Sequence, residues 1–142
     1  MAESKYGKYI LRATGVEKPG SDVSAVLSPV LEGIEDWAGI QHRINWKYIS
    51  QPVVVVEEPH THDYDEFLVF LASDASNAQD FGAEVELSLG EEGEKYIINT
   101  TSVVCIPKGL IHCPLNFRKI SKPILFCNVY VAPEYVRKPV SK

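Results

Sequence analysis

Two histidines and a glutamate stand close together in the segment EEPHTHDYDEFLVF, residues 57–70. On a β-strand, His60 and His62 face the same side and their imidazoles can converge on one ion, whereas on a helix they would point apart. Glu66 would lie about 13 Å further along a straight strand, too far to share a metal bound at about 2.1 Å. The chain must therefore reverse between residues 62 and 66, where Asp63-Tyr64-Asp65 provides turn chemistry. This segment alone is also compatible with a solvated acidic turn.

A further possible ligand lies in PKGLIHCPLN, residues 107–116. Pro107 and Gly109 predict a tight turn, since glycine adopts positive φ without steric cost. His112 follows at the start of the next predicted strand. Asn116 is predicted to be a turn residue that bonds backbone groups. His112 would complete the ligand set of the first segment.

The two segments together resemble the two signature motifs of the cupin superfamily. HxHxxxE corresponds to His60, His62 and Glu66, and PxGxxHxxxN corresponds to Pro107, Gly109, His112 and Asn116. The resemblance covers about residues 53–132. It implies an all-β, double-stranded β-helix (a jelly-roll barrel) in which three histidines and one glutamate hold a divalent metal. The sequence departs from the pattern at three glycine positions, which puts loop geometry in doubt and not the ligands. These positions hold Val54, Ser73 and Thr101.

Such a ligand set suits Fe, Mn, Ni, Co or Zn, and four protein ligands leave positions open for a substrate. We therefore expect a metal-dependent enzyme that acts on a small organic acid, an enol or a sugar-like molecule. The resemblance allows a dioxygenase, or an isomerase or lyase in which Glu66 or Tyr64 moves a proton. The alternative is a non-catalytic cupin that binds a small ligand and keeps a structural metal.

The segment IQHRINWKYI, residues 40–49, alternates in the manner of a strand. Ile40, His42, Ile44, Trp46 and Tyr48 share one face, and Gln41, Arg43, Asn45 and Lys47 share the other. If the first face lines the barrel, His42 and Trp46 would touch a substrate. Phe70 and Tyr130 are further candidates for the substrate pocket. Cys113, next to His112, is predicted to belong to the core.

The rest of the sequence predicts many short strands separated by turns. Residues 83–98 form a predicted hairpin that turns at Gly90–Gly93, and the segments TSVVCIP and PILFCNVYV predict two further apolar strands. We expect an N-terminal extension over residues 1–39, a cupin barrel over 40–135 and a C-terminal tail over 136–142. The extension is predicted to pair with the barrel or with a second subunit.

Composition limits the partners. The chain has 142 residues, a formal net charge of −5 and no cluster of Lys and Arg, so nucleic acid is not an expected partner. The longest aliphatic run is Val53 to Val56, and the N-terminal segment shows no apolar signal region. Three cysteines predict buried thiols and not a disulfide framework. We therefore expect a cytoplasmic protein without a membrane partner. We also expect a homodimer, because small barrels with exposed edges often pair with a second copy, with residues 1–39 as the arm.

Overall fold

The computed structural model describes residues 5–17, 26–31, 39–132 and 136–140. Within them, twelve strands and two short 3₁₀ helices follow one another. They are η1 (Gly7–Tyr9), β1 (Ala13–Glu17), β2 (Val26–Leu31), β3 (Arg43–Ile49), β4 (Val53–Val56), β5 (His60–Thr61), β6 (Glu66–Ala72), η3 (Ala75–Asn77), β7 (Ala83–Leu89), β8 (Glu94–Ile98), β9 (Ser102–Ile106), β10 (His112–Ile120), β11 (Ile124–Tyr130) and β12 (Lys138–Pro139). None of the described helices is long and apolar enough to cross a membrane.

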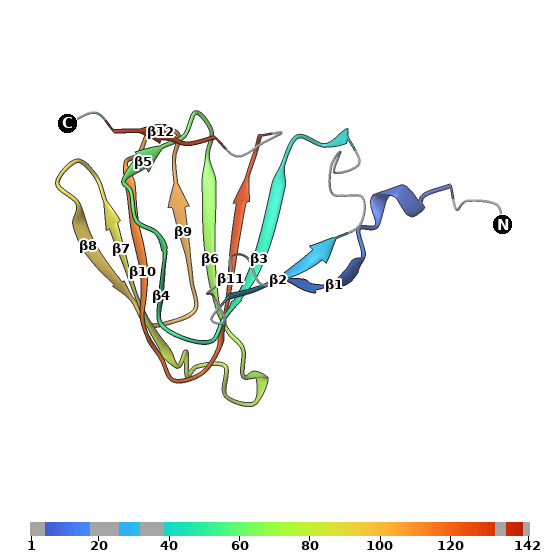
Figure 1. Cartoon of the computed structure of the whole chain (residues 1–142), viewed down its shortest axis with the longest axis horizontal. Helices are drawn as coiled ribbons and strands as arrows, with labels where there is room; N and C mark the ends of the chain where they lie inside the picture. The colour runs from blue at the N-terminus through green and yellow to red at the C-terminus, as the bar shows by residue number, and fades with distance from the viewer. Residues whose placement is uncertain (1–4, 18–25, 32–38, 133–135, 141–142) are drawn as a thin grey trace.

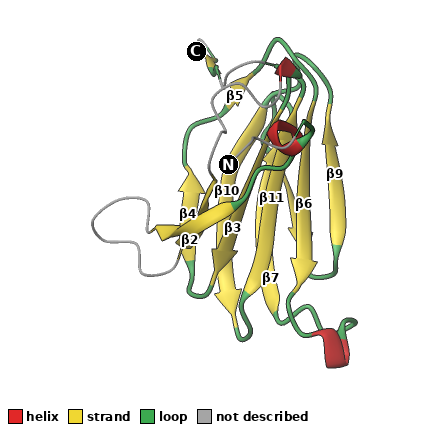
Figure 2. Ribbon diagram, turned by 90° about the vertical axis from the view of Figure 1, so that its right-hand side faces the viewer, coloured by secondary structure: helices red, strands yellow, loops and turns green. Residues whose placement is uncertain are grey.

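The strands form two antiparallel sheets that face each other (Figures 1 and 2). The first sheet has the order β1-β2-β3-β11-β6-β9, and the second has the order β12-β5-β10-β7-β8, with β4 also paired to β10. Strands distant in sequence thus become neighbours, as β3 and β11 do. The prediction of an all-β, double-stranded β-helix is confirmed.

The core fills the space between the sheets because residues alternate between the two faces of each strand. Phe70 of β6, Phe117 of β10 and Phe126 of β11 contact one another, with ring centroids 5.1–6.1 Å apart. All three side chains are buried. This aromatic cluster lies deeper in the barrel than Glu66, which begins β6, and the histidines lie toward the end that carries β5 and β12.

The described parts of the predicted N-terminal extension pair with the barrel. β1 pairs with β2, and β2 pairs with the lower part of β3 through Val26 opposite Ile49 and Leu27 opposite Tyr48. This hairpin projects from the edge of the first sheet (Figure 1). Residues 1–4, 18–25 and 32–38 of the extension lie outside the described residues.

Two turns have the conformations that the sequence predicts. Gly90 and Gly93 both have positive φ in the β7–β8 turn, and Gly109 has φ 85° in the turn before β10. Asn116, in contrast, was wrongly predicted to be a turn residue. It lies within β10 and pairs with Val54 of β4 and Glu86 of β7, because β10 continues through a register shift at Leu115–Asn116.

Candidate metal centre

The topology brings three histidines from two segments together. His60 begins β5 and His112 begins β10, and the two residues are paired across these strands. The ring centroids of the three histidines are 4.4–5.1 Å apart. Each side chain is about 2% exposed. One nitrogen from each ring lies within 4.8 Å of the others, so the three residues form a candidate metal site.

Backbone carbonyls determine which ring nitrogen faces the centre. Nδ1 of His60 donates to the carbonyl of Glu58 at 2.8 Å, and Nδ1 of His112 donates to that of Leu110 at 2.9 Å. Nδ1 of His62 donates to the carbonyl of Val136. Because a carbonyl oxygen only accepts, each Nδ1 must carry the proton and each Nε2 keeps its lone pair. This is the tautomer that a metal-binding histidine adopts when a partner holds its other nitrogen.

The protonation state agrees with this arrangement. Burial lowers the pKa of His60 to about 4, and burial also lowers the pKa of His62 below its ordinary value. Both rings are therefore neutral near pH 7, which is the form that binds a metal. Nε2 of His112 is buried and has no hydrogen-bond partner among the described residues. A lone pair in that position is costly to bury unless something binds it.

Glu66 begins β6, after the reversal predicted between residues 62 and 66, and only 3% of it is exposed. Its Oε1 lies 3.5 Å from Nε2 of His112 and 3.8 Å from Nε2 of His62. Two donors bound to one ion at about 2.1 Å are at most about 4.2 Å apart, so Glu66 and these two nitrogens are close enough to share an ion. Three imidazoles and a carboxylate fit a divalent first-row transition metal.

Hydrogen bonds between two loops set the relative position of the ligands. The backbone N–H of Gly109 donates to the carbonyl of His62 at 3.0 Å, and that of Lys108 donates to Oδ1 of Asp65 at 2.8 Å. The loop before β10 is thereby joined to the loop before β6. Asp65 is a loop residue, as its sequence position suggested.

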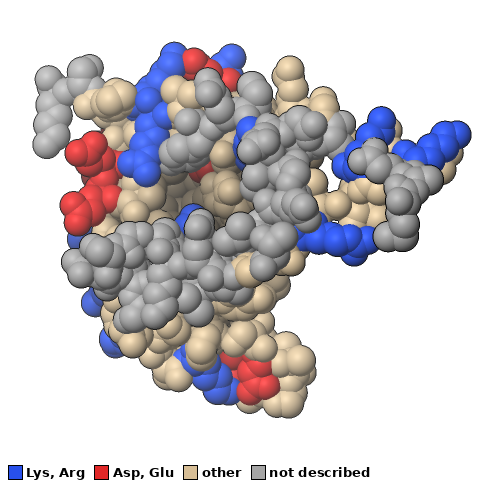
Figure 3. All heavy atoms as spheres, turned by 45° about the vertical axis from the view of Figure 1, so that its right-hand side comes forward, with Lys and Arg blue, Asp and Glu red and all other residues tan. Residues whose placement is uncertain are grey.

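A cavity of about 420 Å³ adjoins the histidines and runs between the two sheets. Figure 3 shows the molecule hollowed here, with charged atoms visible among uncharged ones. Its apolar wall consists of Val55, Val56, Leu68, Cys113, Leu115 and Phe126, and its polar wall consists of Asn45, Lys47, Asn128, Tyr130 and Arg137, beside His60, Glu66 and His112. This volume suits a small organic molecule.

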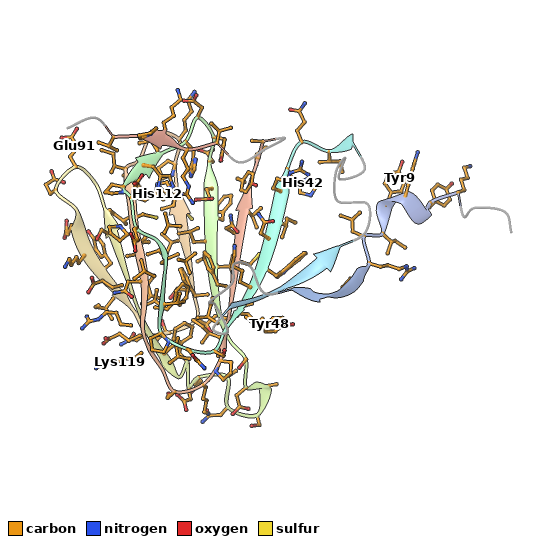
Figure 4. All side chains as sticks on the ribbon, viewed as in Figure 1. Tyr9, His42, Tyr48, Glu91, His112 and Lys119 are labelled. Carbon is orange, nitrogen blue, oxygen red and sulfur yellow. The ribbon has the colours of Figure 1, made fainter. Side chains whose placement is uncertain are left out.

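Of the four residues predicted to bind substrate, only Tyr130 lines this cavity. The expectation for Trp46 and His42 is wrong, because the other face of residues 40–49 points inward. Trp46 is 38% exposed on the outside of the first sheet. His42 precedes β3, where its Nδ1 bonds the Ile40 carbonyl, whereas His112 lies inside the barrel (Figure 4). Phe70 is buried in the core, away from the cavity wall.

Tyr64 does not direct its hydroxyl into the cavity. The hydroxyl donates to the carbonyl of Val136 at 3.3 Å and accepts from the N–H of Val136 at 3.1 Å. Its ring stacks on His62, with centroids 4.8 Å apart, and on Tyr130 at 5.2 Å. Tyr64 therefore supports the position of His62.

Cys113 is buried in the core as predicted, and it also borders the cavity.

Sequence reasoning missed the polar wall and the contribution of the C-terminal segment. Asn45 and Lys47 were grouped on one face, but that face was not recognised as the inner one. The alternation of β3 gave no signal for this, because a polar face that includes Arg43, Asn45 and Lys47 is normally expected to point outward. Val136 had no local signal, because its contact with His62 joins residues 74 positions apart.

No protein-family model matches the sequence, and no curated protein matches it either. Solved structures do match. The polyketide cyclase RemF from Streptomyces resistomycificus aligns with 100% of this chain and 87% of its own, at 14% identity and a TM-score of 0.53. An oxalate oxidase aligns with 89% of this chain and 60% of its own, at 13% identity and a TM-score of 0.54.

A sugar phosphate isomerase of the cupin superfamily from Silicibacter pomeroyi aligns with 85% of this chain and 71% of its own, at 13% identity and a TM-score of 0.52. The chain spans 46–60% of the length of three oxalate oxidase structures among its matches. At these identities the likeness shows the fold, a double-stranded β-helix.

Proposed function

We propose that this chain, whose fold is that of the cupin superfamily, is a metalloenzyme that binds one divalent transition metal through His60, His62, His112 and Glu66. The observation that supports this most directly is the common orientation of the three histidines. Their Nδ1 atoms are all held by backbone carbonyls, and their Nε2 atoms converge beside a cavity. A histidine cluster that served only packing would not need one tautomer on all three rings.

The cavity supports an enzymatic role over a purely structural metal. A divalent metal bound here supplies Lewis-acid or redox chemistry to a substrate that occupies its open positions. A structural site, in contrast, is closed by protein ligands. The histidines form one wall of a cavity of about 420 Å³, so a small molecule can reach the same centre. Because the ligand side chains are buried, bulk water is excluded from the metal centre.

We propose a small organic acid, enol or sugar-like molecule as the substrate, and either a dioxygenase or an isomerase or lyase reaction. In the second case Glu66 is the residue that transfers the proton, because Oε1 faces the histidines and leaves Oε2 for the proton, whereas the Tyr64 hydroxyl is bonded to Val136. Tyr64 then acts as a positioning residue through its stacking on His62. Fe, Mn, Ni and Zn all fit the donor set.

Metal content by mass spectrometry of the untagged protein tests the site. We expect about one equivalent of Fe, Mn, Ni or Zn in the wild type and a loss of at least tenfold in His112→Ala, since one of three imidazoles is removed. His42→Ala is the matched control, because His42 lies outside the cavity wall. It should retain the wild-type content.

Three outcomes would contradict the proposal, the first two for the metal site and the third for the enzymatic role. Absence of metal after reconstitution with each of the four ions would leave a cupin fold that serves as a binding scaffold. Metal that His112→Ala retains in full would place the ion elsewhere. A metal that raises the melting temperature, but whose electron paramagnetic signal no 2-oxo acid or enediol perturbs, would favour the non-catalytic alternative.

A further inference from the structure

Lys47 lies in the cavity wall and forms no ion pair with a carboxylate in the part of the chain that the structure describes. It is on the inward face of β3, level with Phe126 of β11 and Phe70 of β6. Its Nζ lies 5.9 Å from the centroid of the Phe126 ring. Lys47 forms no hydrogen bond or ion pair with any residue in the described part of the chain.

Other lysines of the barrel form ion pairs with carboxylates. Lys122 bridges Asp74 and Asp80 at 3.1 and 3.0 Å, and Lys138 pairs with Asp63 at 2.6 Å. These cations are more exposed and have carboxylates beside them. Burial lowers the pKa of Lys47, because removing an ammonium group from water is unfavourable, and the nearby Cys127 and Glu66 offset this effect only in part. An anion that enters the cavity would offset the cost of burying this ammonium group.

The groups around Lys47 are complementary to an acid. Asn128, one layer closer to the histidines, is part of the same wall. Its Oδ1 is buried and has no hydrogen-bond partner among the described residues, and its Nδ2 lies 3.5 Å from Oε2 of Glu66. Asn45 hydrogen-bonds the Tyr130 hydroxyl. Glu66 is the one acidic residue among the described residues of the wall, and it faces the metal site. With Lys47, Arg137 and a divalent ion, the cavity would carry an excess of positive charge.

The strand register gives the distance along the barrel between the level of Glu66, at the metal site, and the level of Lys47. Arg43 of β3 is level with Tyr130 and, through it, with Glu66. Lys47 lies four residues further along β3, about 13 Å deeper in the barrel at strand spacing. The lysine side chain spans part of this distance. Between the two ends the wall carries Leu68 at the level of Asn45 and Asn128, and the apolar side chains Val55 and Phe126 also line it, with Phe126 level with Lys47.

We propose that Lys47 binds the carboxylate of a small organic acid whose other end coordinates the metal, so that the substrate is an acid with its charge several carbons from the chelating group. This inference rests on the proposed metal site and adds the substrate class to it. Leu68, Val55 and Phe126 contact the carbon chain, and Lys47 selects the charged end.

The test compares 2-oxo diacids of four to six carbons with the 2-oxo monoacids of the same chain length. Both bind the metal through the same end and differ only in the distal carboxylate. In calorimetric titrations of the Mn-reconstituted protein, we expect at least one diacid to bind about tenfold tighter than its monoacid partner. Lys47→Met should remove this preference with little effect on the monoacid.

Two further variants make the result specific. Lys47→Arg should restore most of the preference for the diacid, because it keeps the positive charge. Lys119→Met, which removes an exposed lysine from β10, should leave the preference unchanged (Figure 4). The metal content and melting temperature of each variant are measured beside the titrations.

The same titrations on metal-stripped protein distinguish a failure of this inference from a failure of the proposed metal site. If Lys47 binds the distal carboxylate, a weaker preference for the diacid persists without metal and Lys47→Met abolishes it. A protein that holds metal but shows no preference at any chain length would overturn the role of Lys47 and leave the metal site intact. A preference that Lys47→Met does not change, in either form of the protein, would also overturn it.

Discussion

The histidines of the candidate metal centre are oriented by backbone carbonyls and not by acidic side chains. His60 and His112 each bond the carbonyl two residues earlier, so their orientation is a local property of the chain. His62 depends instead on Val136, a residue near the end of the chain. The site therefore combines two locally oriented ligands with one whose orientation requires the C-terminal segment.

We predict that the metal-free protein loses stability as the pH falls from about 6.5 toward 4. The pKa of His60 is about 4 in the folded protein and 6.5 in an unfolded chain, so the unfolded state binds more protons between these values. The stabilising contribution is fully present above pH 6.5 and is lost as the pH approaches 4. Urea unfolding at pH 5 and pH 7.5 measures it. His60→Gln should lose less stability over this interval than the wild type, and equal losses would contradict the prediction.

At the scale of elements, the site depends on contacts between three segments. The loop before β6 carries His62 and Asp65, and the loop before β10 donates two backbone N–H groups to them. β12 pairs with β5, which places Val136 beside His62 and Tyr64. These bonds hold ligands from separate strands in one arrangement before any metal binds.

We predict that Asp65→Ala weakens metal binding about tenfold and lowers the free energy of unfolding by about 1–2 kcal/mol. The substitution removes the acceptor of the Lys108 N–H without removing a ligand. Asp65→Asn is the matched control, since its amide oxygen can still accept the bond. Competition with a chelator measures the affinity. Loss of affinity in Asp65→Asn equal to that in Asp65→Ala would indicate that the charge matters and not the hydrogen bond.

At the scale of the molecule, the outer face of the first sheet is apolar. Its outward rows across β3, β11, β6 and β9 are Ile44-Val129-Phe67-Cys105, Trp46-Cys127-Val69-Val103 and Tyr48-Leu125-Leu71. Phe67, Leu71 and Val103 are 39%, 41% and 60% exposed. Figure 2 looks onto this sheet. Because these rows carry no charge, the face can pair with itself in a second copy although each chain has a net charge of −5.

We predict that the protein forms a homodimer through this face. Light scattering at micromolar concentration should give twice the 15.8 kDa of one chain. Phe67→Lys should shift the protein to the monomer, because two copies would then bury lysines against each other. Tyr96→Lys is the control, since Tyr96 is an equally exposed aromatic residue on β8 of the other sheet. A monomeric wild type would contradict the prediction.

The sequence by itself determined most strands after residue 39, the turns at Gly90–Gly93 and Gly109, and the common side of His60 and His62, because each depends on neighbours in the chain. Alternation with period two predicts that His60 and His62 share a side, and turn residues predict where the chain returns to Glu66 and His112. Only the tertiary structure decided which face of β3 points inward, since alternation shows which residues lie together and not which way they face. It therefore placed Lys47 in the cavity and Trp46 outside. It also decided that Asn116 lies within β10 and that Val136 holds His62, because both follow from pairing between segments distant in the chain.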